Sequence, residues 1–195
     1  MLELAGTIQR FFNDEVRVQP PADGVLNVGL EENRHDSGDY RIQTILRLSG
    51  DTAPVTLLLR FGTRLPTTDN RVGLDRDQTD FFAALGAARG FGSLHASVEA
   101  GVGINGTRNA AFEQSDVLIY AATLERRGWI APFAAVVGQQ DFHDWELRGN
   151  EDLGELRLGV RIGERHWVRA FFVRGFHDFS PRSGLVLHAG VFFGE

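Results

Sequence analysis

The sequence contains no cysteine and no lysine, so all 20 of its basic residues are arginine. The lack of cysteine excludes disulfides, thiolate catalysis and cysteine-based zinc sites. No apolar run reaches about 18 residues, so we expect no transmembrane helix. With a net charge of −6 and no basic block, the chain has little to attract phosphates, which argues against a nucleic-acid partner.

The start of the chain also lacks a leader sequence. Met1 is followed directly by the strand-like segment LELAGTIQ, without the basic start and apolar stretch of a signal peptide. An exported protein needs such a segment, so we expect the chain as given to be a mature form without its signal peptide, a fragment, or a protein that is not exported. The 195 residues suit one domain, and we predict that residues 1–195 form it, with no linker or second domain.

What the sequence does have is strict alternation of apolar and polar residues. Between 94 and 105, Leu94, Ala96, Val98, Ala100, Val102 and Ile104 alternate with His95, Ser97, Glu99, Gly101, Gly103 and Asn105. The same period recurs at 40–48, 55–64, 155–163 and 185–193. Successive side chains of a strand point to opposite faces, so the pattern predicts strands with one apolar face. Further strands are predicted at 2–11, 15–19, 25–33, 79–89, 116–126, 129–139 and 166–176.

The connections between these strands alternate between short and long from residue 49 onward. Short turns and long loops on opposite ends are typical of outer-membrane barrels, and the clear strands have the 9–11 residues that cross a bilayer when tilted. We therefore predict an all-β, antiparallel up-and-down transmembrane β-barrel of about 12 strands, within a range of 10–12. Aromatic residues near the strand ends would form interfacial girdles. They are Phe11, Phe12, Tyr40, Phe91, Trp129, Trp167, Phe176 and Phe193.

The polar face mixes glycine with single arginine, glutamate and histidine residues. A crowded barrel interior favours small residues beside opposite charges, so we predict that this face points inward and the apolar face meets lipid. The predicted pore-lining residues are Arg41, Arg47, Arg60, Arg64, His95, Glu99, Glu155, Arg157 and Arg161. These charges would set ion or solute preference, or alternatively fill a narrow lumen as a structural network. A soluble ligand-binding barrel with its apolar face inward has the same period and is the alternative.

Residues 57–104 carry a motif series: Arg64, Leu65, Pro66 and Thr67, then Gly73 and Leu74, then Thr79, Asp80 and Phe81 before a strand of small residues. In this series the chain resembles the family of transporter-like outer-membrane β-barrels that includes the phenol-degradation meta-pathway proteins. The likeness continues to about residue 193. It implies an outer-membrane barrel, with a channel for small hydrophobic or aromatic compounds. The family's N-terminal strand region is not recognisable before residue 24, so an N-terminal strand is expected to be missing.

Two other groups of residues could carry chemistry. His95, Ser97 and Glu99 share one strand face and weakly resemble the His-x-Ser arrangement of outer-membrane lipid A deacylases. Asp141, His143, Asp144 and Glu146 could hold a divalent cation, or simply form a solvated acidic loop. The expected function is an outer-membrane pore of a Gram-negative bacterium, not an enzyme. It would have no cofactor or metal, with membrane lipid and a small solute as partners. A lipid hydrolase is a further alternative, and the sequence leaves the oligomeric state open.

Overall fold

The computed structural model describes residues 1–13, 33–67, 78–106, 115–142, 152–177 and 180–194. This part of the chain is all strand, turn and irregular backbone. No helix long and apolar enough to cross a membrane occurs in it.

Eleven strands follow one another along the described chain, close to the predicted positions. They are β1 Leu2–Asn13, β2 Asn33–Asp36, β3 Tyr40–Arg47, β4 Thr56–Leu65, β5 Asp80–Phe91, β6 Leu94–Asn105, β7 Ser115–Arg126, β8 Ile130–Asp141, β9 Leu153–Gly163, β10 His166–Gly175 and β11 Ser183–Phe193. Each pairs antiparallel with its neighbours.

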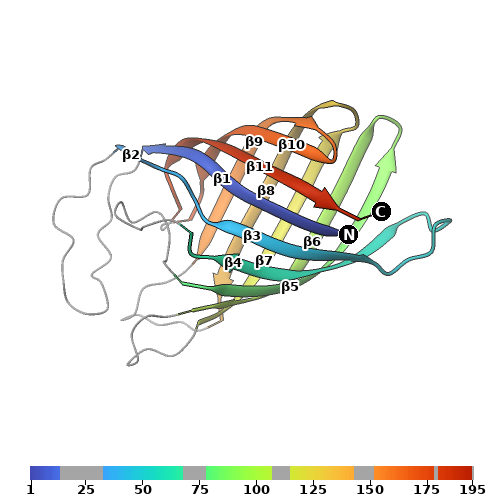
Figure 1. Ribbon diagram of the computed structural model, residues 1–195, viewed down its shortest axis with the longest axis horizontal. Helices are drawn as coiled ribbons and strands as arrows, with labels where there is room; N and C mark the ends of the chain where they lie inside the picture. The colour runs from blue at the N-terminus through green and yellow to red at the C-terminus, as the bar shows by residue number, and fades with distance from the viewer. Residues whose placement is uncertain (14–32, 68–77, 107–114, 143–151, 178–179, 195) are drawn as a thin grey trace.

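The strands close into a barrel, since β1 pairs with β11 along its whole length, from Leu2↔Phe193 to Asn13↔Ser183. On its other side, β1 pairs first with β3 and then with β2. Those two short strands share one position, so the described elements make a ten-strand barrel (Figure 1). The predicted up-and-down barrel is confirmed, but the expected count of about 12 strands is not, since the ten strands lie at the lower end of the range of 10–12. The predicted strands at 15–19 and 25–33 lie outside the described residues, apart from residue 33 in β2.

The two ends of the barrel differ. Short connections at residues 48–55, 92–93, 127–129 and 164–165 all lie at one end, which we call the short-turn end. Both chain termini lie there as well (Figure 1). Five connections join strands at the opposite, long-loop end: four of them are longer than any at the short-turn end, and the fifth, 176–182, is of intermediate length. The predicted alternation of short and long connections is therefore present in the fold.

Gly92 opens the two-residue turn between β5 and β6, with a φ of 59°. A side chain is strained in this left-handed region, by roughly 1–2 kcal/mol. Gly92→Val is therefore expected to lower the free energy of unfolding by about 1 kcal/mol, measured from urea unfolding curves of the folded barrel. Gly50→Val is the matched control, because an added Cβ meets open space at both positions and only Gly92 has a positive φ. Equal losses in the two variants would contradict this explanation.

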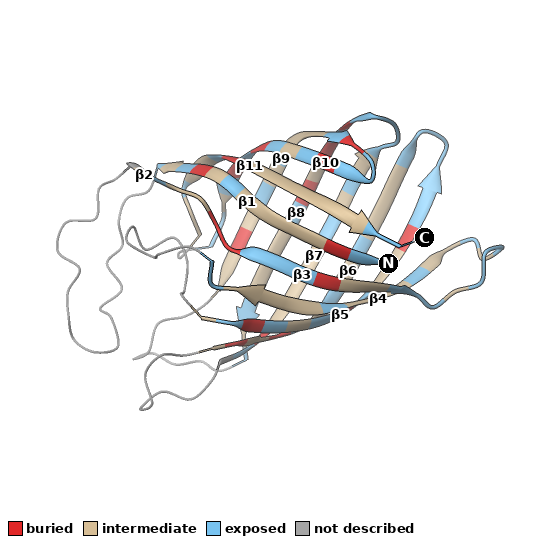
Figure 2. Cartoon of the chain, in the orientation of Figure 1, coloured by how far each residue is buried: buried red, intermediate tan, exposed pale blue. Residues whose placement is uncertain are grey.

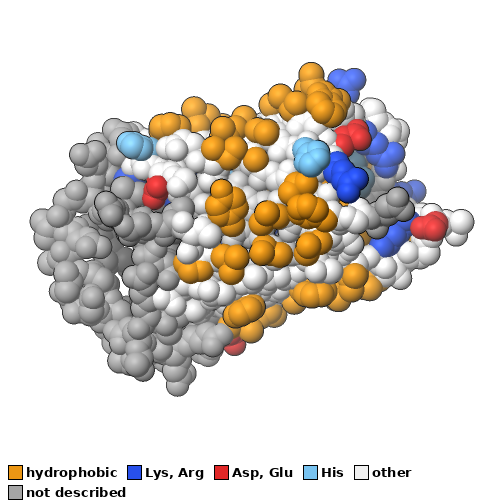
Figure 3. Space-filling view, viewed as in Figure 1, with side chains coloured by type: hydrophobic (Ala, Val, Ile, Leu, Met, Phe, Trp, Pro, Cys, Tyr) orange, Lys and Arg blue, Asp and Glu red, His pale blue; other side chains and the backbone are white. Residues whose placement is uncertain are grey.

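The apolar stripes face outward. On β10, Trp167, Phe171 and Val173 are buried, whereas the alternating Val168 and Phe172 are about two-fifths exposed (40% and 44%). Leu85, Val98 and Leu185 are exposed by 62%, 57% and 60%. Figure 2 shows this alternation along the wall, and Figure 3 shows hydrophobic side chains spread over the face in view, with arginines toward the short-turn end. The face predicted to be apolar is thus the outer surface of the barrel.

Exposed aromatic side chains lie near both ends of the wall. Phe91, Trp129 and Phe193 lie near the short-turn end, and Phe11, Tyr40 and Phe176 near the long-loop end, all at least 45% exposed. Trp167 is a correction to the predicted girdles. It is 5% exposed and points inward against Gly190, because it falls on the inward positions of β10. Phe12 is likewise half-buried, with its ring against Gly184.

The interior also contains an apolar cluster that the sequence did not predict. It consists of Phe133, Ala135, Phe171, Val173 and Val186, with Phe12 and Val137 packed against it. These side chains come from β8, β10, β11 and β1, and they fill part of the space inside the wall. The inward residues of β5 and β6 include small ones such as Ala84, Gly86 and Gly101, and these leave room inside the barrel away from the apolar cluster.

Candidate functional site

Charged side chains line other parts of the barrel interior. They form three groups, each held together by polar contacts. In the first, Arg60 of β4 forms an ion pair with Glu99 of β6, with 3.0 Å between Arg60 Nε and Glu99 Oε2. Arg60 also donates to Gln43 Oε1 over 2.8 Å. The amide of Gln43 donates to the carboxylate of Glu3, which is 7% exposed. One hydrogen-bonded chain therefore links four strands, β1, β3, β4 and β6.

Next to this chain lies a pair of arginines on adjacent strands. Arg41 of β3 and Arg64 of β4 are direct cross-strand partners. Arg64 forms an ion pair with the buried Asp80 of β5, which also accepts a 3.0 Å hydrogen bond from the Gly106 amide. The Arg41 guanidinium lies 5.2 Å from the centroid of the Phe82 ring, and that of Arg60 lies 5.0 Å from it.

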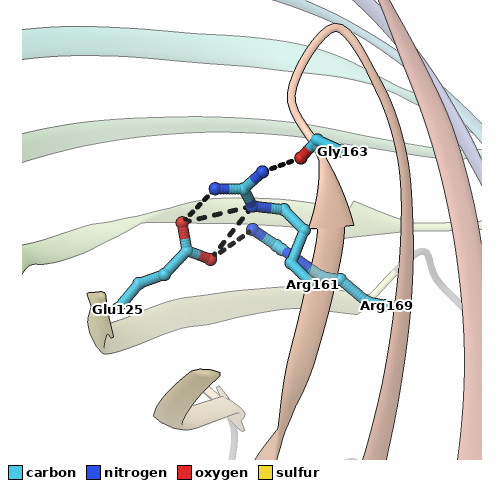
Figure 4. A network of polar contacts seen from close by, with 4 residues as sticks. All are labelled: Glu125, Arg161, Gly163 and Arg169. Atoms are coloured by element: carbon cyan, nitrogen blue, oxygen red, sulfur yellow. Dashed lines mark hydrogen bonds and ion pairs between the residues drawn. The ribbon is translucent and has the colours of Figure 1, made fainter. Parts of the chain in front are cut away.

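The second group surrounds Glu125 near the short-turn end (Figure 4). Arg161 approaches both carboxylate oxygens, with 2.9 Å from Nη2 to Oε1, and also donates to the Gly163 carbonyl. Arg169 reaches the same carboxylate at 3.4 Å. Arg161 and Arg169 are direct cross-strand partners, a repulsive arrangement unless an anion lies between them. Glu125 supplies that negative charge from β7.

The third group lies on the wall formed by β9, β10 and β11. Arg157 forms an ion pair with Glu155 at 2.6 Å, and its guanidinium lies 5.3 Å from the Phe171 ring. His188 of β11 packs edge-on to Phe171, and its Nε2 is 2.8 Å from the Thr7 hydroxyl. Aromatic faces and neighbouring hydroxyls thus hold the polar groups of this wall in place.

The predicted pore-lining residues all take inward positions in the strand registers. Arg47 differs from the others because it lies at the end of β3, where it binds Asp51 of the adjoining turn at 2.8 Å. His95 lies opposite Glu125 across β6 and β7. Ion pairs and hydrogen bonds inside the barrel therefore involve most of the predicted residues, whereas the ion pair of Arg47 lies at the short-turn end of the barrel.

Several interior polar residues were not among the predicted pore-lining residues. They are Glu3, Gln43, Asp80, Glu125, Arg169 and His188. Glu125 and Arg169 were missed because their strands carry apolar residues on both faces, so alternation gives no clear inner side. The cross-strand register supplies the missing signal, since it places Glu125 opposite His95 and Arg169 opposite Arg161.

The hydrolase alternative finds little support in this geometry. His95, Ser97 and Glu99 do share the inner face of β6. However, the Glu99 carboxylate is bound to Arg60 and is not orienting His95. Among the described residues no group of three histidine or acidic side chains could hold a metal ion. The predicted loop residues His143, Asp144 and Glu146 lie outside the described part of the chain.

The interior remains partly open to solvent. The side chains of Arg60, Arg64 and Arg157 keep exposed fractions of 17%, 30% and 30% although they point inward. Fully packed side chains would lose nearly all of their exposure. A barrel of eight strands is just wide enough for side chains to fill, and ten strands enclose more space. The arrangement can therefore hold water and small polar solutes beside its charges.

Neither a protein-family model nor a curated protein matches this chain.

Proposed function

We propose that this chain is an outer-membrane β-barrel whose charged interior passes small solutes. The proposal rests on one observation: the leucine, valine and phenylalanine stripes lie exposed on the outside of a closed barrel, while the ion pairs lie inside. In water such a surface would cost free energy at every strand, at about 25 cal/mol per Å² of apolar area. In the hydrocarbon core of a bilayer, the same apolar surface carries no such cost.

Closure of the sheet supports the same proposal. A bilayer core offers no water to bind open backbone groups, so only helices and closed barrels span it. Here the β1–β11 pairing closes the sheet, and among the described strands the short β2 at the long-loop end, which pairs with β1 alone, is the exception. Exposed aromatic residues near both ends of the wall correspond to the interfacial girdles of such barrels.

Solute passage is supported by the composition of the interior. A ligand-binding barrel in water would present its apolar stripes inward, around an apolar ligand. The interior of this barrel instead combines an apolar cluster with partly exposed arginines and carboxylates. The resemblance in residues 57–104 points to small hydrophobic or aromatic compounds as solutes, and the charges would act on polar or charged ones.

The proposal is tested by refolding the purified chain into detergent and into phospholipid vesicles. We expect the unheated sample to migrate differently from the boiled sample on a gel, because the closed barrel resists detergent. We also expect the folded protein to conduct ions in a planar bilayer. A protein that is monodisperse in buffer and binds no detergent would refute the membrane assignment. A folded, inserted barrel without conductance or solute uptake would refute passage alone.

A further inference from the structure

Arg41 differs from the other inward arginines of the described strands in its partners. Arg60, Arg64, Arg157 and Arg161 each form an ion pair with a carboxylate. Arg41 forms none with the described part of the chain; its guanidinium is held over the Phe82 ring. Arg41 points into the barrel and is exposed there. A positive charge that has no ion pair among the described residues therefore meets the water inside the barrel.

The surroundings of Arg41 reinforce this charge. Arg64 is its direct cross-strand partner, and Arg60 shares the Phe82 ring with it. Arg157, on the opposite wall, is within electrostatic range as well. The negative charge of Glu3, whose carboxylate accepts the hydrogen bond from Gln43, is in range too and opposes the three arginines. Like charges on directly opposed residues destabilise a sheet, and the Asp80 carboxylate forms its ion pair with Arg64, so Arg41 adds a cost in stability that a structural role alone does not explain.

We propose that Arg41, with Arg60, Arg64 and Arg157 around it, makes the passage selective for small anions such as chloride and carboxylates. A guanidinium offers several donors to an anion, and rings of arginine set the preference of anion pores. The guanidinium groups of Arg41 and Arg60 lie 5.2 and 5.0 Å from the centroid of the same Phe82 ring, so two positive charges are already gathered at one place on the wall. This inference rests on the proposed function, because it assumes that ions enter the barrel.

The test is the reversal potential of single barrels in a planar bilayer under a potassium chloride gradient. Wild-type protein is expected to favour chloride over potassium. Arg41→Gln is expected to reduce the permeability ratio by at least about fivefold, because one unit charge at about 4 Å in water changes the partition of each ion by about that factor and acts in opposite senses on chloride and potassium. Arg41→Lys keeps the charge and should retain most of the selectivity. Arg89→Gln is the matched control, because Arg89 lies on the outward positions of β5 and should leave the ratio unchanged.

Three results would overturn the inference while leaving passage intact: cation selectivity, no selectivity, or an Arg41→Gln ratio equal to that of wild type. A folded, inserted barrel with neither conductance nor solute uptake would instead refute passage, the part of the proposed function on which the inference rests. In that case chloride binding is measured directly, as broadening of the chloride-35 NMR line by the barrel in detergent. Broadening that is lost in Arg41→Gln and kept in Arg89→Gln would uphold an anion site. Equal broadening in all variants would refute it. Heat-dependent gel migration verifies that each variant is folded.

Discussion

Leu85→Arg is expected to destabilise the folded barrel in lipid vesicles by about 2–4 kcal/mol, the cost of an arginine on the lipid face at the bilayer midplane. Leu85 lies in the middle of β5 and is 62% exposed on the outer wall. The free energy is measured from reversible urea unfolding in vesicles, followed by tryptophan fluorescence. A large loss at so exposed a position has no explanation in water, where an arginine there would be harmless.

The matched control is Leu94→Arg, the same substitution on an outward residue at the short-turn end of β6. Near the interface the cost of a lipid-facing arginine falls to about 0–1 kcal/mol, because its side chain reaches the headgroups. The difference between the two variants therefore measures depth in the membrane. Small and equal effects at both positions would indicate that the outer wall does not face hydrocarbon.

Glu125→Gln is expected to lower the free energy of unfolding by about 3 kcal/mol. Removing one partner of a buried ion pair costs roughly 3–5 kcal/mol, and the lower figure applies because the group remains partly open to solvent. The Glu125 carboxylate separates Arg161 from Arg169, so its neutral form leaves two adjacent guanidinium groups to repel each other. The loss is measured as the shift in urea midpoint at constant slope.

Asp51→Asn provides the comparison. It removes the partner of Arg47 at the rim, where the aspartate side chain is 94% exposed and the pair is screened by water. Little change is expected there. The double variant Glu125→Gln with Arg169→Gln should recover part of the lost stability, since one of the two repelling charges is gone. If Glu125→Gln were as mild as Asp51→Asn, the group around Glu125 would not be a structural support of the barrel.

A β-bulge in β1 is one feature of the fold that the sequence did not predict. Strict alternation along residues 2–11 would place Arg10 on the same face as Leu2 and Leu4. The register of β1 against β11 shifts between Thr7 and Gln9, which leaves Ile8 as an extra residue that is 49% exposed. After this bulge Arg10 lies inward, opposite Val186. A bulge changes the face of every later residue, and nothing in the local composition of β1 announces it.

The partners within the interior ion pairs are a second feature that the sequence did not predict. The inward positions of Arg60 and Glu99 follow from alternation, but their contact joins residues 39 positions apart in the chain. Alternation says only that both point inside. Which carboxylate each arginine reaches depends on strand register and on the neighbouring small residues, here Ala84 and Gly101, that leave space between them.

Sequence alone determined the local features of this protein: the strands, the short turns between them and the face on which each arginine of the clear strands lies. These follow from side chains alternating every second residue, which needs no knowledge of distant segments. Only the tertiary structure decided that the barrel closes with ten strands and that Trp167 points inward. It also decided that Glu125 holds two arginines while Arg41 has none of the described carboxylates. Closure and ion pairing are set by how strands far apart in the chain align, and a local period carries no information about that alignment.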